Sequence, residues 1–494
     1  MLVFIAISMT IILAFTAFTV DFGAWYNRSA QIKRAADAAA LAGVVWMPEF
    51  DQAQSAALAA AARNGFVNGQ NDIEIKVEQV EENNRQLRVS IRDKSADQYF
   101  SRVVLQNQSI GRESLAEYVL PVPLGSPKNT FGTGDLLSGS DRENFWAAAS
   151  GYCSGHESGD KKLSFYESYS TSSSSSGCNN SSPASTDDYD PDGYLYAIKL
   201  PENSSSLKLE VWDAPYFTSG SRADAGLLSG QAITTTFEVY DRNPTPLDLS
   251  NLTLLQSYTF TTDQSTSTYR EQWTRLRTWT SPQAGIYYLR VKTSAADTNN
   301  SRGSNGFAIR AFTGSSFATC TTISGAPGYS TACPQIHGVS DMSIFANSPD
   351  STAGFYLAQI DPVHAGKTMR VNLFDSGEGA QTLRVLDPNG NAVSFAWSTF
   401  CNPPTPPSGG CSGTGSSLNV SGTGTKAYTY LNSGSKYNDR TLVLDIPLPT
   451  NYTTVYGTKT WWKVQYEMLN TDASVTDRTT WTVNIVGDPV HLIN

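Results

Sequence analysis

Residues 1–43 read MLVFIAISMTIILAFTAFTVDFGAWYNRSAQIKRAADAAALAG, and this stretch decides how the chain begins its fold. The first 20 residues carry no charge, and a helix of that length spans roughly 30 Å, the thickness of a bilayer's apolar core. Asp21 ends the apolar run, and Trp25 and Tyr26 follow where an interfacial aromatic belt would lie. We therefore predict a retained transmembrane helix over residues 1–26, anchoring the chain in membrane lipid.

The alternative interpretation of this segment is a cleaved signal peptide. Three features disfavour it: the apolar run is longer than a signal-peptide core, no basic segment precedes it, and no small-residue cleavage site follows promptly. Asp21 lies where a carboxylate is costly unless it is wetted or paired. We expect it to set the depth of the helix or to meet a partner amine; the alternative is an ordinary residue at the membrane interface.

Helical patterning continues beyond the apolar run. Small residues recur there at three-to-four spacing and form a narrow stripe along the predicted helix, a pattern that lets another helix approach closely. The stripe consists of Ala35, Ala36, Ala39, Ala40 and Gly43. We expect these residues to serve helix packing.

The acidic end of the apolar run, V-D-F-G at residues 20–23, is followed by Q-I-K-R-A-A-D-A-A-A-L-A-G at residues 31–43. Together they resemble the N-terminal signature of the Tad (Flp) pilus-assembly TadE/TadG-like family. Strand-like segments at residues 73–80 and 86–93 extend the resemblance to about residue 120. Family members often carry a basic patch before the apolar run, whereas this sequence begins at Met1 inside it.

The resemblance implies a place at the cell surface. It implies other pilus or pilin-like subunits as partners of the N-terminal helix. It also implies a single-pass cell-membrane protein with an extracellular domain, or a protein incorporated in a surface pilus. Residues 27–120 would then form a helical extension and a small α/β subdomain.

Composition narrows the class of protein further. Charged residues make up 16% of the 494 residues, against roughly 25% in ordinary globular domains, and the formal net charge is −10. An acidic chain with few basic residues lacks the electrostatic footprint for nucleic acid, so we exclude nucleic acid as a partner. The six cysteines form three sequence-local pairs in polar loops, which predicts disulfides; reduced, buried thiols are the alternative. The pairs are Cys153 with Cys178, Cys320 with Cys333, and Cys401 with Cys411.

After a turn-rich linker at residues 121–127, short alternating strands replace helical patterns. Two halves show the same order of strand-like segments, which suggests a duplication. The corresponding segments are residues 193–214 and 354–377, 235–244 and 382–391, 284–293 and 459–468, and 305–314 and 478–487. We predict an α+β N-terminal part followed by a mainly-β ectodomain of two tandem jelly-roll-like β-sandwich domains, at residues 128–318 and 319–494.

A second, weaker resemblance lies in the string G-I-Y-Y-L-R-V at residues 285–291. It is similar to sequences in prepeptidase C-terminal-type modules, which are small secreted β-sandwiches.

The string D-D-Y-D-P-D-G at residues 187–193 is the strongest candidate metal site, and D-S-G-E at residues 375–378 is a weaker one. Alternating carboxylates can converge on a hard cation, so Asp187, Asp188, Asp190 and Asp192 are candidate Ca²⁺ ligands, and Ca²⁺ is the only cofactor indicated. An EF-hand is excluded because Lys199 stands where the loop's final Glu belongs. The alternative is an Asp/Pro/Gly turn that leads into a strand.

Catalytic motifs are absent from the sequence. It contains only four His, and no G-x-S-x-G, H-E-x-x-H or P-loop string. We predict a non-catalytic, membrane-anchored surface protein associated with Tad/Flp-type pilus assembly or surface attachment.

Two alternatives remain open. One is an anchored carbohydrate-binding adhesin: adjacent Trp461 and Trp462 point to opposite faces of a strand, and one of them could stack on a surface glycan unless both lie in the core. The other is a secreted hydrolase that uses the Asp-rich loop.

Overall fold

The structure is a computed structural model, and it forms two compact units. Unit 1 comprises Met1–Leu120, Thr245–Ser250 and Asp488–Asn494; unit 2 comprises Pro121–Pro244 and Asn251–Gly487. The structure describes residues 2–47, 50–80, 83–96, 98–100, 108–118, 122–132, 145–156, 159–166, 186–217, 224–226, 232–243, 249–266, 268–297, 301–347, 352–374, 380–399, 411–420, 440–468, 476–486 and 490–493.

Unit 1 consists of two helices and a four-stranded antiparallel sheet of order β1-β2-β3-β26. Strands alternate between buried apolar and exposed polar residues, as Ile75 and Lys76 do on β1, so one face packs on the helices and the other stays polar. The elements are α1 (Leu2–Val44), α2 (Phe50–Arg63), β1 (Ile73–Val80), β2 (Asn83–Asp93), β3 (Ile110–Tyr118) and β26 (Val490–Ile493).

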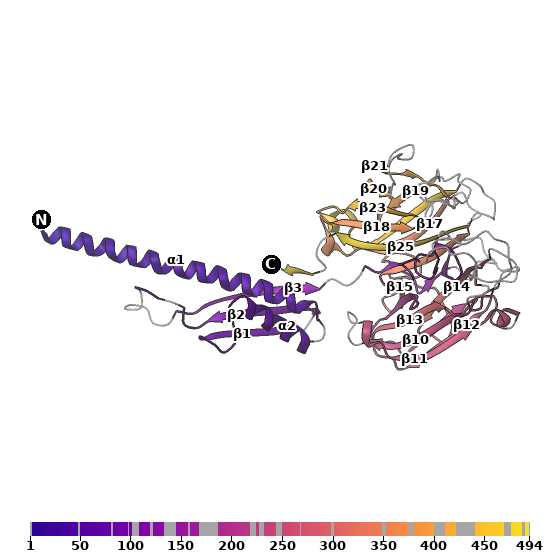
Figure 1. Cartoon of the computed structure of the whole chain (residues 1–494), viewed down its shortest axis with the longest axis horizontal. Helices are drawn as coiled ribbons and strands as arrows, with labels where there is room; N and C mark the ends of the chain where they lie inside the picture. The colour runs from indigo at the N-terminus through magenta and orange to yellow at the C-terminus, as the bar shows by residue number, and fades with distance from the viewer. Residues whose placement is uncertain are drawn as a thin grey trace. The chain divides into compact units, whose positions relative to one another are not determined.

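Helix α1 is much longer than the sheet it packs on, and its N-terminal half runs free of the sheet and α2 (Figure 1). Residues 1–26 were expected to span a membrane. In the described part of the chain, however, no helix is both long and apolar enough to cross one, so the structure does not support that expectation.

Unit 2 contains two large sheets built from short strands. The ten-stranded sheet has the order β11-β10-β13-β7-β15-β4-β17-β24-β19-β22. Its strands are β4 (Leu124–Gly125), β7 (Tyr194–Leu200), β10 (Thr235–Asn243), β11 (Leu254–Phe260), β13 (Gly285–Thr293), β15 (Gln335–Gly338), β17 (Thr352–Gln359), β19 (Ala380–Leu386), β22 (Leu418–Asn419) and β24 (Trp461–Met468).

The second sheet has the order β12-β8-β14-β6-β16-β25-β18-β23-β20-β21, with β5 and β9 paired to β14. Its strands are β5 (Thr130–Phe131), β6 (Phe145–Ser150), β8 (Ser206–Trp212), β9 (Ala225–Gly226), β12 (Trp273–Thr280), β14 (Gly303–Phe312), β16 (Asp341–Asn347), β18 (Thr368–Phe374), β20 (Phe395–Thr399), β21 (Ser412–Gly415), β23 (Thr441–Pro447) and β25 (Thr476–Val486). The short 3₁₀ turns η3 (Leu249–Asn251), η4 (Thr262–Thr266) and η5 (Pro362–His364) and helix α3 (Tyr452–Tyr456) connect strands.

The two halves of unit 2 repeat one strand order. In the first sheet, β11-β10-β13-β7 is matched from the opposite edge by β22-β19-β24-β17; in the second, β12-β8-β14-β6 is matched by β23-β18-β25-β16. Matched strands also follow one another in the same sequence order. The corresponding segments predicted from the sequence therefore occupy corresponding places in the sheets.

The halves also exchange their first strands. Strand β4, which opens the first half, pairs with β17 of the second half, while β15, which opens the second half, pairs with β7 of the first. The exchange makes the ten-stranded sheet continuous across the two halves, and the pairing of β6 with β16 joins the halves in the second sheet. A single apolar cluster contains buried residues from both halves, such as Leu209 and Leu444. The predicted boundary between two β-sandwich domains, residues 128–318 and 319–494, stays a prediction.

The predicted disulfide between Cys320 and Cys333 is confirmed, with Cα atoms 5.7 Å apart. Cys153 and Cys411 are also disulfide-bonded. Their predicted partners, Cys178 and Cys401, lie outside the described residues.

Candidate functional site

The N-terminal half of α1 presents apolar side chains to solvent over more than half of its circumference. At 100° per residue, the exposed positions run from position 7 through positions 4 and 12 to position 20 and cover about 220° of the helix surface. The exposed side chains are Phe4, Ile5, Ile7, Met9, Ile12, Phe15, Phe18, Val20, Phe22 and Tyr26. So wide an apolar surface on a helix is stable in water only when other apolar surface covers it. This half of α1 is the candidate association surface.

Asp21 lies at the base of that surface and is fully buried. Its Oδ1 accepts hydrogen bonds from the backbone N–H of Tyr99 at 2.9 Å and of Phe100 at 3.2 Å, and its Oδ2 accepts one from Phe100 at 3.0 Å. Backbone amides of the same chain therefore bind Asp21, and the expectation that it sets the depth of the helix or meets a partner amine stays a prediction. Asp21 ties residues 98–100 to the side of α1.

The sequence did not predict the structural consequence of these hydrogen bonds. Tyr99 and Phe100 are 65% and 55% exposed, so Asp21 holds two aromatic rings in solvent close to Phe22 and the end of the apolar run. The structure places these two residues in a bend. The adjacent aromatic pair was the only signal in the sequence.

The small-residue stripe packs inside unit 1. Ala35, Ala36, Ala39 and Ala40 are buried in the cluster that α1 forms with α2 and the sheet. A Cβ atom on Gly43 would lie 2.7 Å from the Ala53 carbonyl oxygen of α2 and 2.5 Å from Leu87 Cδ2 of β2. The predicted close approach of a helix occurs, but the helix is α2 of the same chain. The stripe is not available to another subunit.

Charged residues near the stripe also serve unit 1 itself. Arg28 contacts Asp93 at the end of β2, with its Nη2 2.7 Å from Oδ2, and lies over the Phe66 ring. Lys33 bonds Asp37 one turn further along α1 at 2.7 Å and the Glu113 carbonyl oxygen of β3 at 3.2 Å. These contacts hold the C-terminal half of α1 against the sheet, whereas the N-terminal half extends beyond the sheet.

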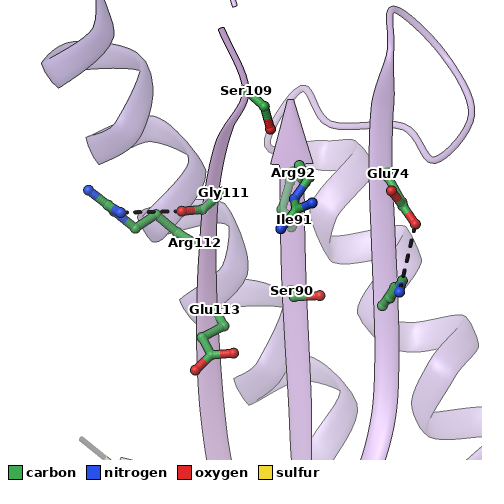
Figure 2. Close-up of a pocket in the computed structure, with 9 residues that line it drawn as sticks. Glu74, Ser90, Ile91, Arg92, Ser109, Gly111, Arg112 and Glu113 are labelled. Carbon is green, nitrogen blue, oxygen red and sulfur yellow. Dashed lines mark hydrogen bonds and ion pairs between the residues drawn. The ribbon is translucent and has the colours of Figure 1, made fainter. Parts of the chain in front are cut away.

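Unit 1 also carries a polar cavity of about 380 Å³ on the sheet face opposite the helices (Figure 2). It forms because two residues on this face have little or no side chain: Gly111, which lies opposite Arg92, and Ser90, which lies opposite Glu113. Lys94, outside the cavity, bonds Glu74 at 3.0 Å and holds the pKa of Glu74 below its usual value. The lining consists of Glu74, Lys76, Ser90, Ile91, Arg92, Ser109, Gly111, Arg112 and Glu113.

The lining of this cavity contains oppositely charged side chains. Its lining contains neither His nor Cys, and Arg92 on β2 and Glu113 on β3 present opposite charges across it (Figure 2). Such a surface can accept polar or charged groups, but its lining offers no nucleophile paired with a general base.

The predicted Ca²⁺ site does not form. Asp188 lies 3.4 Å from Lys161 Nζ and 3.5 Å from His156 Nε2, Asp190 lies 3.2 Å from Lys162 Nζ, and Asp192 lies 2.9 Å from Arg290 Nη1. These three carboxylates each face a different cation instead of converging, and Asp187 is exposed. Among the described residues no group of three or more metal-binding side chains is arranged to hold an ion. The Asp/Pro/Gly turn, the alternative interpretation of this string, agrees with these contacts.

The predicted glycan-stacking pair is buried. Trp462 is fully buried and donates its Nε1–H to the Tyr452 hydroxyl at 2.9 Å, and Trp461 is 6% exposed and packs edge-on against Tyr356. Neither ring offers a face to a sugar, so the stacking role assigned to them is wrong. Two core layers on opposite faces of β24 explain the adjacent tryptophans.

Comparison with known families identifies the N-terminal segment. Residues 1–45 match the family model described as "Putative Flp pilus-assembly TadE/G-like". The resemblance to the Tad family is thereby confirmed over α1, and it associates this part of the chain with the cell envelope or a pilus. No curated protein matches the chain.

Solved structures give only distant likenesses. The N-terminal CBM22-1–CBM22-2 tandem domain of Paenibacillus barcinonensis Xyn10C is 12% identical, covering 58% of this chain and 80% of its own, with a TM-score of 0.14. Tripeptidyl peptidase 2 is 9% identical (89% and 43% covered, TM-score 0.20). The M60 catalytic domain with CBM51 domains of Clostridium perfringens ZmpB is 8% identical (83% and 43% covered, TM-score 0.16). At these TM-scores none of the three carries an argument.

Proposed function

We propose that this chain is a non-catalytic component of a Tad/Flp-type pilus or of its assembly apparatus at the cell surface. It associates with other subunits through the N-terminal half of α1. Unit 2 then supplies a large β-structured surface for attachment. The observation that carries the proposal is the coincidence of the family match, residues 1–45, with the helix that, among the described elements, exposes apolar side chains over more than half of its circumference.

The energetics of α1 support association with other helices. Covering an exposed Phe or Ile side chain contributes about 1.5–3 kcal/mol, so burial of even a few of the side chains on this surface drives assembly. A bundle of similar helices covers all sides of α1 at once, which a flat partner surface cannot do. The C-terminal half of α1 is already packed on α2 and the sheet and holds the free half at a fixed exit point.

Photocrosslinking tests this proposal in the pilus-producing cell. A photoreactive amino acid replaces Phe15 in the full-length chain, and adducts are identified by mass spectrometry. We expect adducts with a second copy of this chain or with subunits that have their own N-terminal apolar helix. In parallel, Phe15→Asp should lower the amount of this chain in sheared surface pili at least tenfold, because a charge at that point opposes helix packing.

The matched control is Val363, a 40% exposed apolar residue of unit 2. Photoreactive substitution at position 363 should give no adduct with those subunits, and Val363→Asp should leave the pilus content unchanged. If position 15 gave adducts with lipid alone, we would conclude that this half of α1 attaches to a membrane instead of associating with other helices. Normal recovery of Phe15→Asp in pili would contradict the proposal.

A further inference from the structure

Four aromatic side chains of unit 2 form one cluster that belongs to no feature described so far. We name Tyr152, Phe165, Tyr166 and Tyr189 the aromatic platform. Tyr152 stacks on Phe165 with ring centroids 4.7 Å apart, and Tyr189 meets both rings edge-on at 5.5 and 5.3 Å. Tyr166 packs edge-on against Phe165 at 5.0 Å. The rings come from segments up to 37 residues apart in sequence, so the fold assembles the cluster.

Backbone hydrogen bonds hold these segments in place. The Phe165 N–H donates to the Tyr152 carbonyl at 3.3 Å, and the Phe165 carbonyl accepts from the Thr186 N–H at 2.9 Å. The Tyr166 carbonyl accepts from the His156 N–H at 2.7 Å. The platform is thus supported by main-chain bonds to two neighbouring segments. A preorganised surface loses little entropy when it binds a ligand.

The platform faces solvent in part. All four residues are partly exposed, unlike the buried aromatic rings of the main core. In the described part of the chain, no hydrogen bond joins the hydroxyls of Tyr152, Tyr166 or Tyr189 to the protein. Partial burial raises the pKa of Tyr152 and of Tyr189, so both hydroxyls stay protonated and can donate at neutral pH. Apolar ring surface is therefore bordered by free polar groups.

The charges beside the platform select the class of ligand. Asp187 and Asp188 are exposed and directly precede Tyr189, and Asp188 is only partly neutralised by Lys161 at 3.4 Å. The chain as a whole carries a formal charge of −10. An anionic ligand is therefore repelled, whereas carboxylates readily accept hydrogen bonds from uncharged hydroxyls.

We infer that the aromatic platform binds a neutral oligosaccharide. The C–H-rich face of a pyranose ring packs on an exposed aromatic ring, and its hydroxyls bond to the tyrosine hydroxyls and to Asp187. A quaternary ammonium ligand fits less well, because such a cation is enclosed by separate rings, whereas these rings fill the space between themselves. This inference does not depend on α1 or on the pilus proposal.

The test measures binding of the full-length chain to cellohexaose, xylohexaose, chitohexaose and mannohexaose by calorimetry. We expect at least one of these neutral hexasaccharides to bind, and Tyr189→Ala to raise its Kd at least tenfold. Tyr189→Phe retains the ring and should raise the Kd by a smaller factor. Far-UV circular dichroism of each variant establishes that it is folded. The Kd of Tyr166→Ala tests the platform at a second residue.

The control is Tyr329→Ala, which removes a 47% exposed aromatic residue elsewhere in unit 2 and should leave the Kd within twofold of its original value. Three results would overturn the inference: none of the four hexasaccharides binds, Tyr329→Ala weakens binding as much as Tyr189→Ala does, or only choline or polygalacturonate binds at the platform.

Discussion

Carboxylates in this chain are satisfied in two different ways. Asp21 accepts backbone N–H bonds in a fully buried position. Asp190 and Asp192 face cations at the surface, which contributes little to stability. Asp224 is also buried and accepts hydrogen bonds from two backbone donors, the N–H of Gly306 at 2.7 Å and the N–H of Phe217 at 2.5 Å. The environment of each residue, and not its type, determines its role.

Removal of the Asp21 carboxylate should loosen the segment that carries Tyr99 and Phe100. Asp21→Ala leaves two part-buried N–H groups without this acceptor, and we expect it to destabilise unit 1 by about 2 kcal/mol. Hydrogen exchange at the amides of Tyr99 and Phe100 should become faster. The control, Asp37→Ala on the same helix, removes only an ion pair with Lys33 and should cost less than about 1 kcal/mol. Equal losses for the two variants would contradict the assigned role of Asp21.

Asp224 should make unit 2 less stable as the pH rises. Burial, followed by the nearby charge of Asp213, raises the pKa of Asp224 well above its ordinary value. A raised folded-state pKa gives stability that is fully present below the unfolded pKa of about 3.9 and is lost as pH rises through the folded pKa. Asp224→Asn removes this dependence, so its unfolding free energy minus that of the wild type should increase from pH 4 to pH 8. Urea denaturation at several pH values checks this, and parallel profiles would argue against it.

Individual strands are assembled into sheets by partners far away in sequence. The two-residue strand β4 illustrates this: it pairs with β15 on one side and β17 on the other, and so joins the two halves of the ten-stranded sheet. Gly125 in β4 has a φ of +103°, and a Cβ there would lie 2.8 Å from the Phe131 ring and 3.0 Å from Met342 Cε. A glycine is required at this position both for backbone conformation and for space.

Gly125→Ala should therefore be costly, and Gly390→Ala separates the two causes. Gly390 also has a positive φ, +89°, but nothing lies within 4 Å of the position that a Cβ atom would occupy there. We expect Gly390→Ala to cost about 1 kcal/mol from backbone strain alone. Gly125→Ala adds overpacking of the core and should cost about 3 kcal/mol in total. Chemical denaturation gives both values, and a cost for Gly125→Ala no larger than that for Gly390→Ala would refute the steric explanation.

Segments from the N-terminal and C-terminal parts of the chain both belong to unit 1. Strand β26 pairs with β3 through Val490 opposite Tyr118 and Leu492 opposite Ala116, and Leu492 packs on the core of the unit. Unit 2 is thus inserted between the segments that complete unit 1. An insertion of this kind leaves the outer unit dependent on a strand that follows the inserted unit in the sequence.

Deletion of residues 490–494 should weaken unit 1 selectively. The deletion exposes the edge of β3 and removes the Leu492 contact, so amides of β3 should exchange faster and the melting transition of unit 1 should fall. Exchange in β7 and β13 of unit 2 should not change. Unaltered exchange in β3 after the deletion, or an equal loss of protection in unit 2, would show that β26 does not stabilise unit 1 in this way.

The candidate site was only half predictable from the sequence. The apolar run and the small-residue stripe depend on neighbours along the chain, and both were predicted to be helical, which α1 confirms. The family resemblance, predicted to about residue 120, is confirmed over residues 1–45, and the membrane span is not supported. Which molecule covers the stripe could not be read, because a small-residue surface is complementary to any close helix, and here α2 fills it. The aromatic platform was missed because its four rings come together only through loop hydrogen bonds.

By itself, the sequence determined the order and period of the elements: one long helix, a small α/β part, and two series of matching strands, since these follow from alternation and composition over a few residues. Only the tertiary structure decided that the two series share both sheets, that Trp461 and Trp462 are buried, and that β26 returns to unit 1. Pairing across hundreds of residues depends on backbone groups that every sequence presents alike, so the choice of partner is settled by packing of the whole chain.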